Sequence, residues 1–176
     1  PFPLSNREDG TIDVSALEAA VKPDDFHLPK TRLFCLENTW AGRVLPLDYI
    51  EAACGAARTR GLRCHLDGAR MFNAAVKLGV AASVIAGSFD TVSFCLSKGL
   101  SAPIGSVLCG AAETIGKARR LRKMLGGGMR QAGVIASAGI IALETMVDRL
   151  AEDHANARLL AEGLDDIPGF TVDMHA

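Results

Sequence analysis

The 176-residue sequence has few aromatic residues, no excess of either charge and no long hydrophobic run. Aromatic residues make up 5% of the chain, with one Trp and one Tyr. Lys and Arg number 19 against 20 Asp and Glu, so nothing indicates a nucleic-acid or membrane-surface partner. The longest apolar run, 132–143, contains Gly and Ser and is too short to span a bilayer. Collagen-like, coiled-coil and disordered classes are also excluded.

The five cysteines are scattered and include no C-x-x-C pair. An odd number without pairing spacing is typical of reduced thiols, and it favours neither a disulfide framework nor a metal site. No basic-then-apolar leader opens the chain, so a cytoplasmic location is the expectation. The first residue is Pro1 rather than Met. We therefore expect either that processing removed a segment or that the sequence is part of a longer chain.

Short apolar segments alternate with helical ones. Strands are predicted over 31–36, 62–66, 91–96, 106–109 and 169–172, and helices over 13–21, 46–60, about 71–78, 112–124, 129–147 and 150–164. This alternation predicts an α/β fold with a mostly parallel sheet flanked by helices. The 129–147 helix is apolar nearly all round, so we expect it to be buried in the core or at a subunit interface.

Polar and charged residues follow three of the predicted strands. They are Asn38, then Asp67 with Arg70, then Lys98 in a Ser-Lys-Gly turn. Ligands of open α/β sheets bind outside the carboxyl ends of the strands, so these residues predict a site at one edge. Taken singly, each has a simpler interpretation: a helix cap for Asp67, and solvated surface residues for Arg70 and Lys98.

Together, these side chains indicate pyridoxal 5'-phosphate chemistry. Lys98 ends an apolar strand and precedes Gly99, where desolvation would favour the neutral amine that forms Schiff bases. Asp67 could keep the pyridine nitrogen of the cofactor protonated, so that the ring accepts electrons. Arg70 offers a planar guanidinium for the carboxylate of an amino acid.

Four motifs carry a family resemblance, and a fifth segment supports it. The motifs are Leu36–Thr39, His65–Asn73, Cys95–Leu100 and Lys123–Gln131, and the supporting segment is Asp153–Ala157. In this order and spacing, from about residue 10 to about 164, the chain resembles the L-threonine aldolase family. The resemblance implies a type I pyridoxal-phosphate fold, in which 1–164 is part of the large domain and 165–176 begins a small one. It also implies retro-aldol cleavage of L-threonine or L-allo-threonine to glycine and acetaldehyde, impaired in a fragment.

The resemblance assigns roles to particular residues. It implies that Lys98 holds the cofactor aldehyde, that Asp67 faces the pyridine nitrogen and that Arg70 binds the substrate carboxylate. Asn38 would lie near the phenolic oxygen of the cofactor. Lys123 and Arg130 would reach the phosphate side of a neighbouring subunit in a homodimer or homotetramer, although a merely solvated basic helix is the simpler interpretation.

The sequence departs from the family pattern at Trp40, where many relatives have His, and it does not identify the general base. We expect His65 to face away from Asp67 or into the core, and His154 to make a structural hydrogen bond. His27 is expected in a loop, and His175 is terminal. Two alternatives stay open: another pyridoxal-phosphate lyase, and a non-catalytic truncated paralogue.

Overall fold

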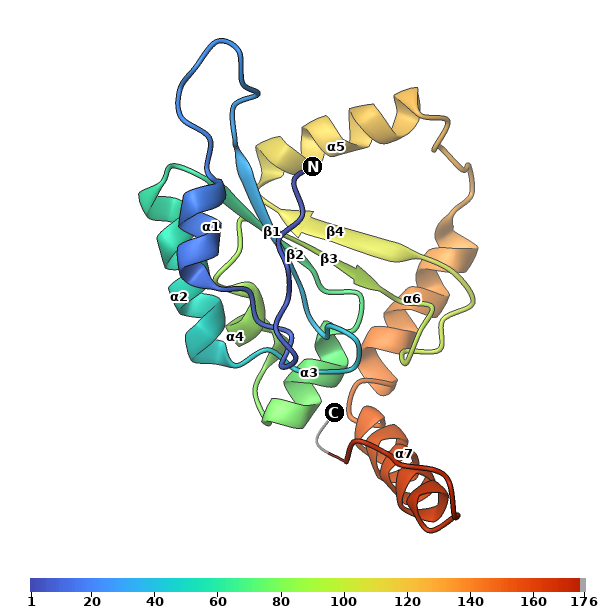
Figure 1. Cartoon of the computed structure of the whole chain (residues 1–176). Coiled ribbons are helices and arrows are strands. Elements are labelled where there is room, and N and C mark those ends of the chain that lie inside the picture. Colours follow the sequence, from blue (N-terminus) through green and yellow to red (C-terminus); the bar gives the residue numbers. More distant parts are fainter. Residues whose placement is uncertain (175–176) are drawn as a thin grey trace.

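The computed structural model, which describes residues 1–174, contains one four-stranded sheet in the order β1-β2-β3-β4 (Figure 1). The strands are β1 (Leu33–Glu37), β2 (Arg63–Asp67), β3 (Thr91–Cys95) and β4 (Ser106–Gly110). β1, β2 and β3 are parallel, and β4 runs antiparallel to β3. The predicted mostly parallel α/β sheet is thereby confirmed.

Seven helices connect and flank the strands within residues 1–174. They are α1 (Val14–Ala20), α2 (Leu47–Thr59), α3 (Met71–Leu78), α4 (Ala82–Ala86), α5 (Ala112–Met124), α6 (Gly133–Thr145) and α7 (Leu150–Asp165). α4 is not predicted from the sequence, because a helix of five residues is too short to show a helical period. The predicted strand over 169–172 is wrong, since the structure has no strand there.

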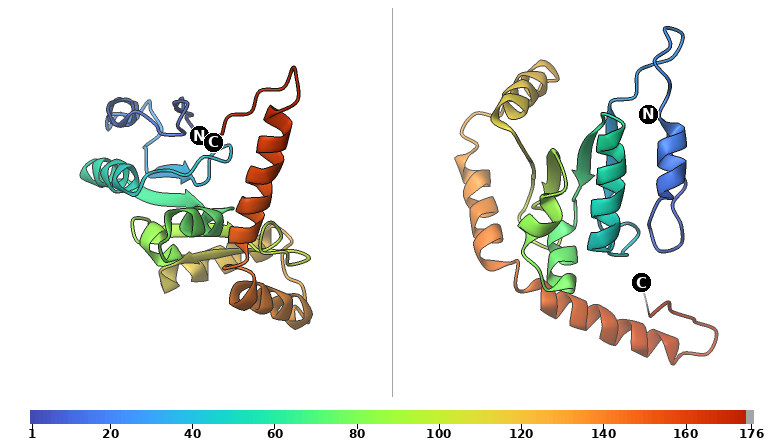
Figure 2. Two further views of the ribbon diagram at one scale, coloured as in Figure 1. Left: turned by 90° about the horizontal axis from the view of Figure 1, so that it is seen from below. Right: turned by 90° about the vertical axis from the view of Figure 1, so that its left-hand side faces the viewer.

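The core lies on one face of the sheet. Alternate strand residues, among them Phe34, Leu36, Leu66 and Phe94, are buried. On the other face, the β1 residues, such as Leu33, are exposed, whereas those of β3 are half-buried. α2 packs against β2 and α1 packs against α2, whereas α5 and α6 stand on the opposite side of the sheet from them (Figure 2). None of the helices in the described part of the chain has the length and apolarity that a bilayer crossing needs.

The core position predicted for the apolar helix over 129–147 is wrong. The structure forms α6 there, with Val134, Ile140 and Ile141 exposed at 82%, 55% and 59%. Its buried residues are Gly139 and Ala142, and a methyl group on Gly139 would lie 2.9 Å from Leu96 Cδ1. α6 therefore contacts the domain through a narrow stripe of small residues, which leaves its large side chains outside. The subunit-interface alternative stays a prediction.

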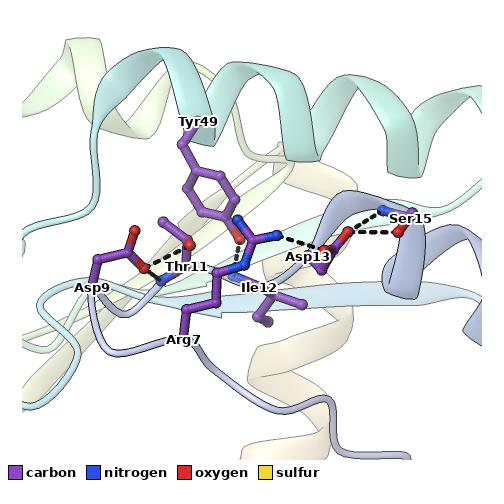
Figure 3. Close-up of polar contacts among 7 residues, drawn as sticks. All are labelled: Arg7, Asp9, Thr11, Ile12, Asp13, Ser15 and Tyr49. Carbon is purple, nitrogen blue, oxygen red and sulfur yellow. Dashed lines mark hydrogen bonds and ion pairs between the residues drawn. The ribbon is translucent and has the colours of Figure 1, made fainter.

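A polar network fastens the segment before α1 to α2 (Figure 3). The Tyr49 hydroxyl accepts a hydrogen bond from the Ile12 backbone N–H at 2.8 Å. Asp13 caps α1 by accepting from the Ser15 N–H and hydroxyl, and it pairs with Arg7. The hydrogen bonds from Ser15, reinforced by Arg7, lower the pKa of Asp13 to about 2. Burial raises the pKa of Tyr49 above its ordinary value of 10.0.

We predict that Tyr49→Phe destabilises the fold by about 1 kcal/mol, because the Ile12 N–H loses its acceptor while the ring packing is retained. The measurement is the urea midpoint, with Thr114→Val on exposed α5 as control. The raised Tyr49 pKa means that burial disfavours the phenolate in the native state, so the stability of the fold declines as pH rises past 10. A midpoint equal to that of the control would contradict the role of the hydroxyl.

Candidate active site

Backbone hydrogen bonds bring the carboxyl ends of β1, β2 and β3 to one edge. The Asn38 N–H donates to the Asp67 carbonyl at 3.0 Å, and the Gly68 N–H donates to the Ser93 carbonyl at 2.7 Å. A methyl group on Gly68 would lie 2.9 Å from that same Ser93 oxygen, so a glycine lets the turn approach β3 this closely. Asp67 is therefore fixed between the two neighbouring strands.

The turn from Asp67 to Arg70 presents two exposed charged side chains. Asp67 Oδ1 accepts from the Ala69 N–H at 3.1 Å, and the other carboxylate oxygen makes no hydrogen bond within residues 1–174. Arg70 occupies the N-cap position of α3 without a side-chain cap bond, and its guanidinium forms no ion pair in the described chain. Both groups are free to bind a ligand at this edge.

The backbone around Lys98 is held in a compact turn after β3. The Ser101 N–H donates to the Lys98 carbonyl at 2.8 Å, and the Ala102 N–H donates to the Leu96 carbonyl at 3.0 Å. Leu100 is buried beneath the turn. The Lys98 side chain is exposed and forms neither a hydrogen bond nor an ion pair with residues 1–174. The predicted desolvation of Lys98 is thus wrong for this chain, because no described segment covers its amine.

The structure brings Asp67, Arg70 and Lys98 to the same edge of the sheet, as the sequence predicts. The turns after β2 and β3 thus carry a carboxylate, a guanidinium and an amine, none of which pairs with another within residues 1–174. This donor set suits a ligand that carries a protonated ring nitrogen, a carboxylate and an aldehyde. No cluster of three or more His, Cys, Asp or Glu side chains within 1–174 is arranged to hold a metal ion.

Asn38 is part of the framework of this edge. Its side chain is fully buried, and Oδ1 accepts from the Leu45 N–H at 3.2 Å. The Nδ2 atom is also buried and has no partner in residues 1–174. The structure therefore leaves one amide donor unused next to the end of β2. The predicted contact between Asn38 and a cofactor remains a prediction.

Two histidine predictions have different outcomes, and His175 lies outside the described residues. His65 shares a sheet face with Asp67, because the two are separated by one residue in β2, so the predicted opposite orientation is wrong. The period-two alternation of a strand would have shown this from the sequence. His65 Nδ1 lies 2.8 Å from Thr91 Oγ1. The structural hydrogen bond predicted for His154 is confirmed, since its Nε2 lies 3.3 Å from Asn73 Nδ2.

Lys123 and Arg130 lie elsewhere. Lys123 is in the last turn of α5, Arg130 is in the segment between α5 and α6, and both are exposed. Figure 1 shows the segment between α5 and α6 well away from the start of α3, so within one chain it lies apart from the turn that leads from β2 into α3. A methyl group on Gly128 would lie 2.9 Å from Lys123 Nζ, which places the glycine-rich segment against this amine.

A hollow of about 640 Å³ runs along β1. The segment Pro1–Leu4, part of α1 and the residues around β1 line it, and Asp67 stands at its rim, while Arg70 and Lys98 do not contribute. The hollow is thus formed mainly beside β1. Of the three charged residues at the sheet edge, only Asp67 borders it.

Comparisons with known proteins agree with this geometry. A model of the beta-eliminating lyase family matches residues 1–176. The chain is 48% identical over 164 residues to the low specificity L-threonine aldolase of Escherichia coli (strain K12), covering 93% of this chain and 49% of that protein. It is 47% identical over 182 residues to low-specificity L-threonine aldolase 1 of Arabidopsis thaliana, covering 100% and 51%. The chain therefore spans about half the length of the curated relatives it matches.

Solved structures share the fold. The threonine aldolase of Leishmania major matches with a TM-score of 0.76 and 20% identity, over 92% of this chain and 49% of that one. The PLP-bound C-S lyase of Staphylococcus hominis matches with a TM-score of 0.59 and 16% identity, over 93% and 43%. The resemblance drawn from the sequence motifs is confirmed: the chain belongs to the beta-eliminating lyase family, and its relatives include low-specificity L-threonine aldolases.

Proposed function

We propose that the protein containing this chain cleaves L-threonine or L-allo-threonine to glycine and acetaldehyde with pyridoxal 5'-phosphate as cofactor. The observation that carries the proposal is the unpaired set of Asp67, Arg70 and Lys98 at one sheet edge. The names of relatives at 47% and 48% identity support the substrate class. A structural neighbour described as PLP-bound supports the cofactor.

The residues present fit this cofactor. Asp67 has a carboxylate oxygen without a hydrogen-bond partner among residues 1–174, which suits a protonated pyridine nitrogen. Lys98 has an amine without an ion pair, which suits an aldehyde carbon. When bound, the cofactor would supply the electron sink that makes cleavage of a Cα–Cβ bond possible.

The chain's own groups would orient the substrate and hold protons. Asp67, fixed by the Ala69 N–H, would keep a proton on the ring nitrogen opposite its free oxygen. Arg70 would bind the substrate carboxylate through two parallel N–H donors, which orients the amino acid. The Lys98 amine, once released by the amino group of the substrate, would be free to accept or give a proton at Nζ. We assign the proton of the β-hydroxyl to no residue of this chain.

We also propose that a second copy of the protein completes the site. Lys123 and Arg130 are exposed, and the segment between α5 and α6 lies away from the start of α3, while large apolar side chains of α6 are exposed. Packing of α5 and α6 against another subunit would bury these apolar residues and place the two cations near its anionic ligand. The exposed edge around Lys98 supports the further proposal that the 176 residues alone have little or no activity, since solvent reaches all three charged groups.

The first test is an absorbance spectrum with added pyridoxal 5'-phosphate, before and after borohydride. We expect a visible band that borohydride fixes onto Lys98, identified by peptide mass spectrometry, and no band for Lys98→Ala. Lys77→Ala, an exposed lysine on α3, is the matched control and should keep the band. The spectra are recorded both for the 176-residue chain and for the full chain that the gene encodes. Absence of a band in both would refute the cofactor proposal.

The reaction is tested with L-threonine and L-allo-threonine by assaying two pairs of products. Retro-aldol cleavage gives glycine and acetaldehyde, whereas β-elimination gives 2-oxobutyrate and ammonia. We expect glycine and acetaldehyde in equal amounts, and a fall of about 100-fold or more in kcat/KM for Arg70→Leu, because a charge-assisted carboxylate contact is removed. Release of 2-oxobutyrate instead would establish the alternative, another pyridoxal-phosphate lyase.

The interface proposal predicts that Ile140→Glu with Ile141→Glu lowers the oligomeric state, because charges replace apolar side chains at the proposed contact. Sedimentation or light scattering of the full chain gives the measurement. Leu159→Glu with Leu160→Glu on α7 is the control, since these leucines are equally exposed but lie outside the proposed contact. The same oligomer in both double variants would contradict the interface.

A further inference from the structure

The turn that carries Lys98 is packed against two helices. Gly99, the next residue, lies where α3 and α7 approach the turn: a methyl group built on it would meet Leu150 Cδ2 at 2.6 Å and Asn73 Oδ1 at 3.4 Å. Asn73 belongs to α3 and Leu150 begins α7. A side chain at 99 would clash with Leu150 while only touching Asn73, so glycine lets the backbone after Lys98 lie close to α7 beside α3.

The contact with α7 is a specific one. Leu150 is fully buried and is the one buried residue of α7 within the described chain, whose remaining side chains are largely exposed. It therefore acts as an anchor for the helix, and the surface against which it is anchored includes the backbone that follows Lys98. The position of α7 and that of the lysine turn are physically linked through this contact.

Asn73 joins the same three elements through its amide. Its Nδ2 lies 3.3 Å from His154 Nε2, one turn along α7 from Leu150, while the amide group faces Gly99. The Asn73 Nδ2 group can only donate, so it points toward His154 Nε2. The hydrogen bond therefore fixes the orientation of the Asn73 amide. Asn73 also lies one helical turn after Arg70, so the same helix carries the guanidinium and the amide that borders the lysine turn.

We propose that Asn73, held by His154, is a positioning residue that seats the Lys98–Gly99 turn against α3 and so fixes Lys98 relative to Arg70. The inference rests on the proposed function, in which Lys98 and Arg70 bind the cofactor and the substrate carboxylate. Neither Asn73 nor His154 touches the reacting atoms; both act through the backbone of the turn. Apolar side chains between α3 and α7 would be enough for stability. A polar pair at this contact adds a defined orientation, which is what positioning the turn requires.

The test compares Asn73→Leu and His154→Leu with Asn156→Leu in the full chain that the gene encodes. Leu resembles Asn in size, and Asn156 is an exposed residue of α7 that serves as the matched control. We expect kcat per cofactor-labelled molecule to fall about tenfold in the first two variants, with KM within about twofold, because a small displacement of a reacting group is costly. His154→Gln, whose side-chain oxygen can still accept from Asn73, should restore most of the loss.

A second readout does not depend on activity. The amides of Ser101 and Ala102 close the lysine turn, so their hydrogen exchange reports how firmly the turn is held. We expect exchange at these amides to be faster in Asn73→Leu and His154→Leu than in Asn156→Leu. The share of borohydride-fixed pyridoxyl label on Lys98, relative to the other lysines, should fall in parallel.

Gly99→Ala provides a test by shape. Gly99→Ala should reproduce the fall in kcat and the faster amide exchange. Adding Leu150→Ala to this variant should partly restore both, because it removes the side chain that the new methyl group meets. Gly163→Ala on α7, where a methyl group would meet nothing within 4 Å, is the control. If the Asn73 and His154 variants match Asn156→Leu in both exchange and kcat, the inference is wrong even though the enzyme works. If exchange changes but the wild-type chain neither labels at Lys98 nor turns over, the proposed function fails and the contact stands.

Discussion

The parallel hydrogen-bonded ladder of β1, β2 and β3 is the constraint on which the rest of the structure depends. Its register pairs Glu37 with Asp67 and Asp67 with Ser93, so β1 and β2 end at one level while β3 continues to Cys95. The ladder continues past the strand ends through the Asn38 and Gly68 amides. Each strand is followed by a turn with a polar or charged residue. The shared direction of the parallel strands therefore places Asp67, Arg70 and Lys98 at the same edge of the sheet.

Close approaches at this edge and beside it rely on glycine. A methyl group on Gly68 would meet the Ser93 carbonyl at 2.9 Å, one on Gly99 would meet Leu150 at 2.6 Å, and one on Gly139 would meet Leu96 at 2.9 Å. These contacts seat the Asp67 turn, the Lys98 turn and α6 on their neighbours. The backbone around the charged groups is thus well packed, whereas the charged groups themselves remain in solvent. The backbone of the site is thus fixed while its charged side chains stay open to solvent. This arrangement fits the proposal that a second copy of the protein completes the site.

The distribution of exposed apolar residues agrees with that interpretation. α5 has no buried residue, and α6 is attached by Gly139 and Ala142 while its larger side chains face outward. The chain spans about half the length of the curated relatives it matches. Physically, the described residues make a stable core on one face of a sheet and leave the site edge and the α6 surface uncovered.

Local physics allowed the sequence by itself to determine much of this protein. The apolar periodicity located the four strands and the long helices, and the residues after the strands predicted a site at Asp67, Arg70 and Lys98, because strand ends and charged turns are local features. Tertiary packing decided the antiparallel β4, the exposure of α6 and of Lys98, and the pairing of Asn73 with His154 across 81 residues. Those outcomes depend on which surfaces meet, and no local pattern of residues encodes which distant segment will cover a helix or an amine.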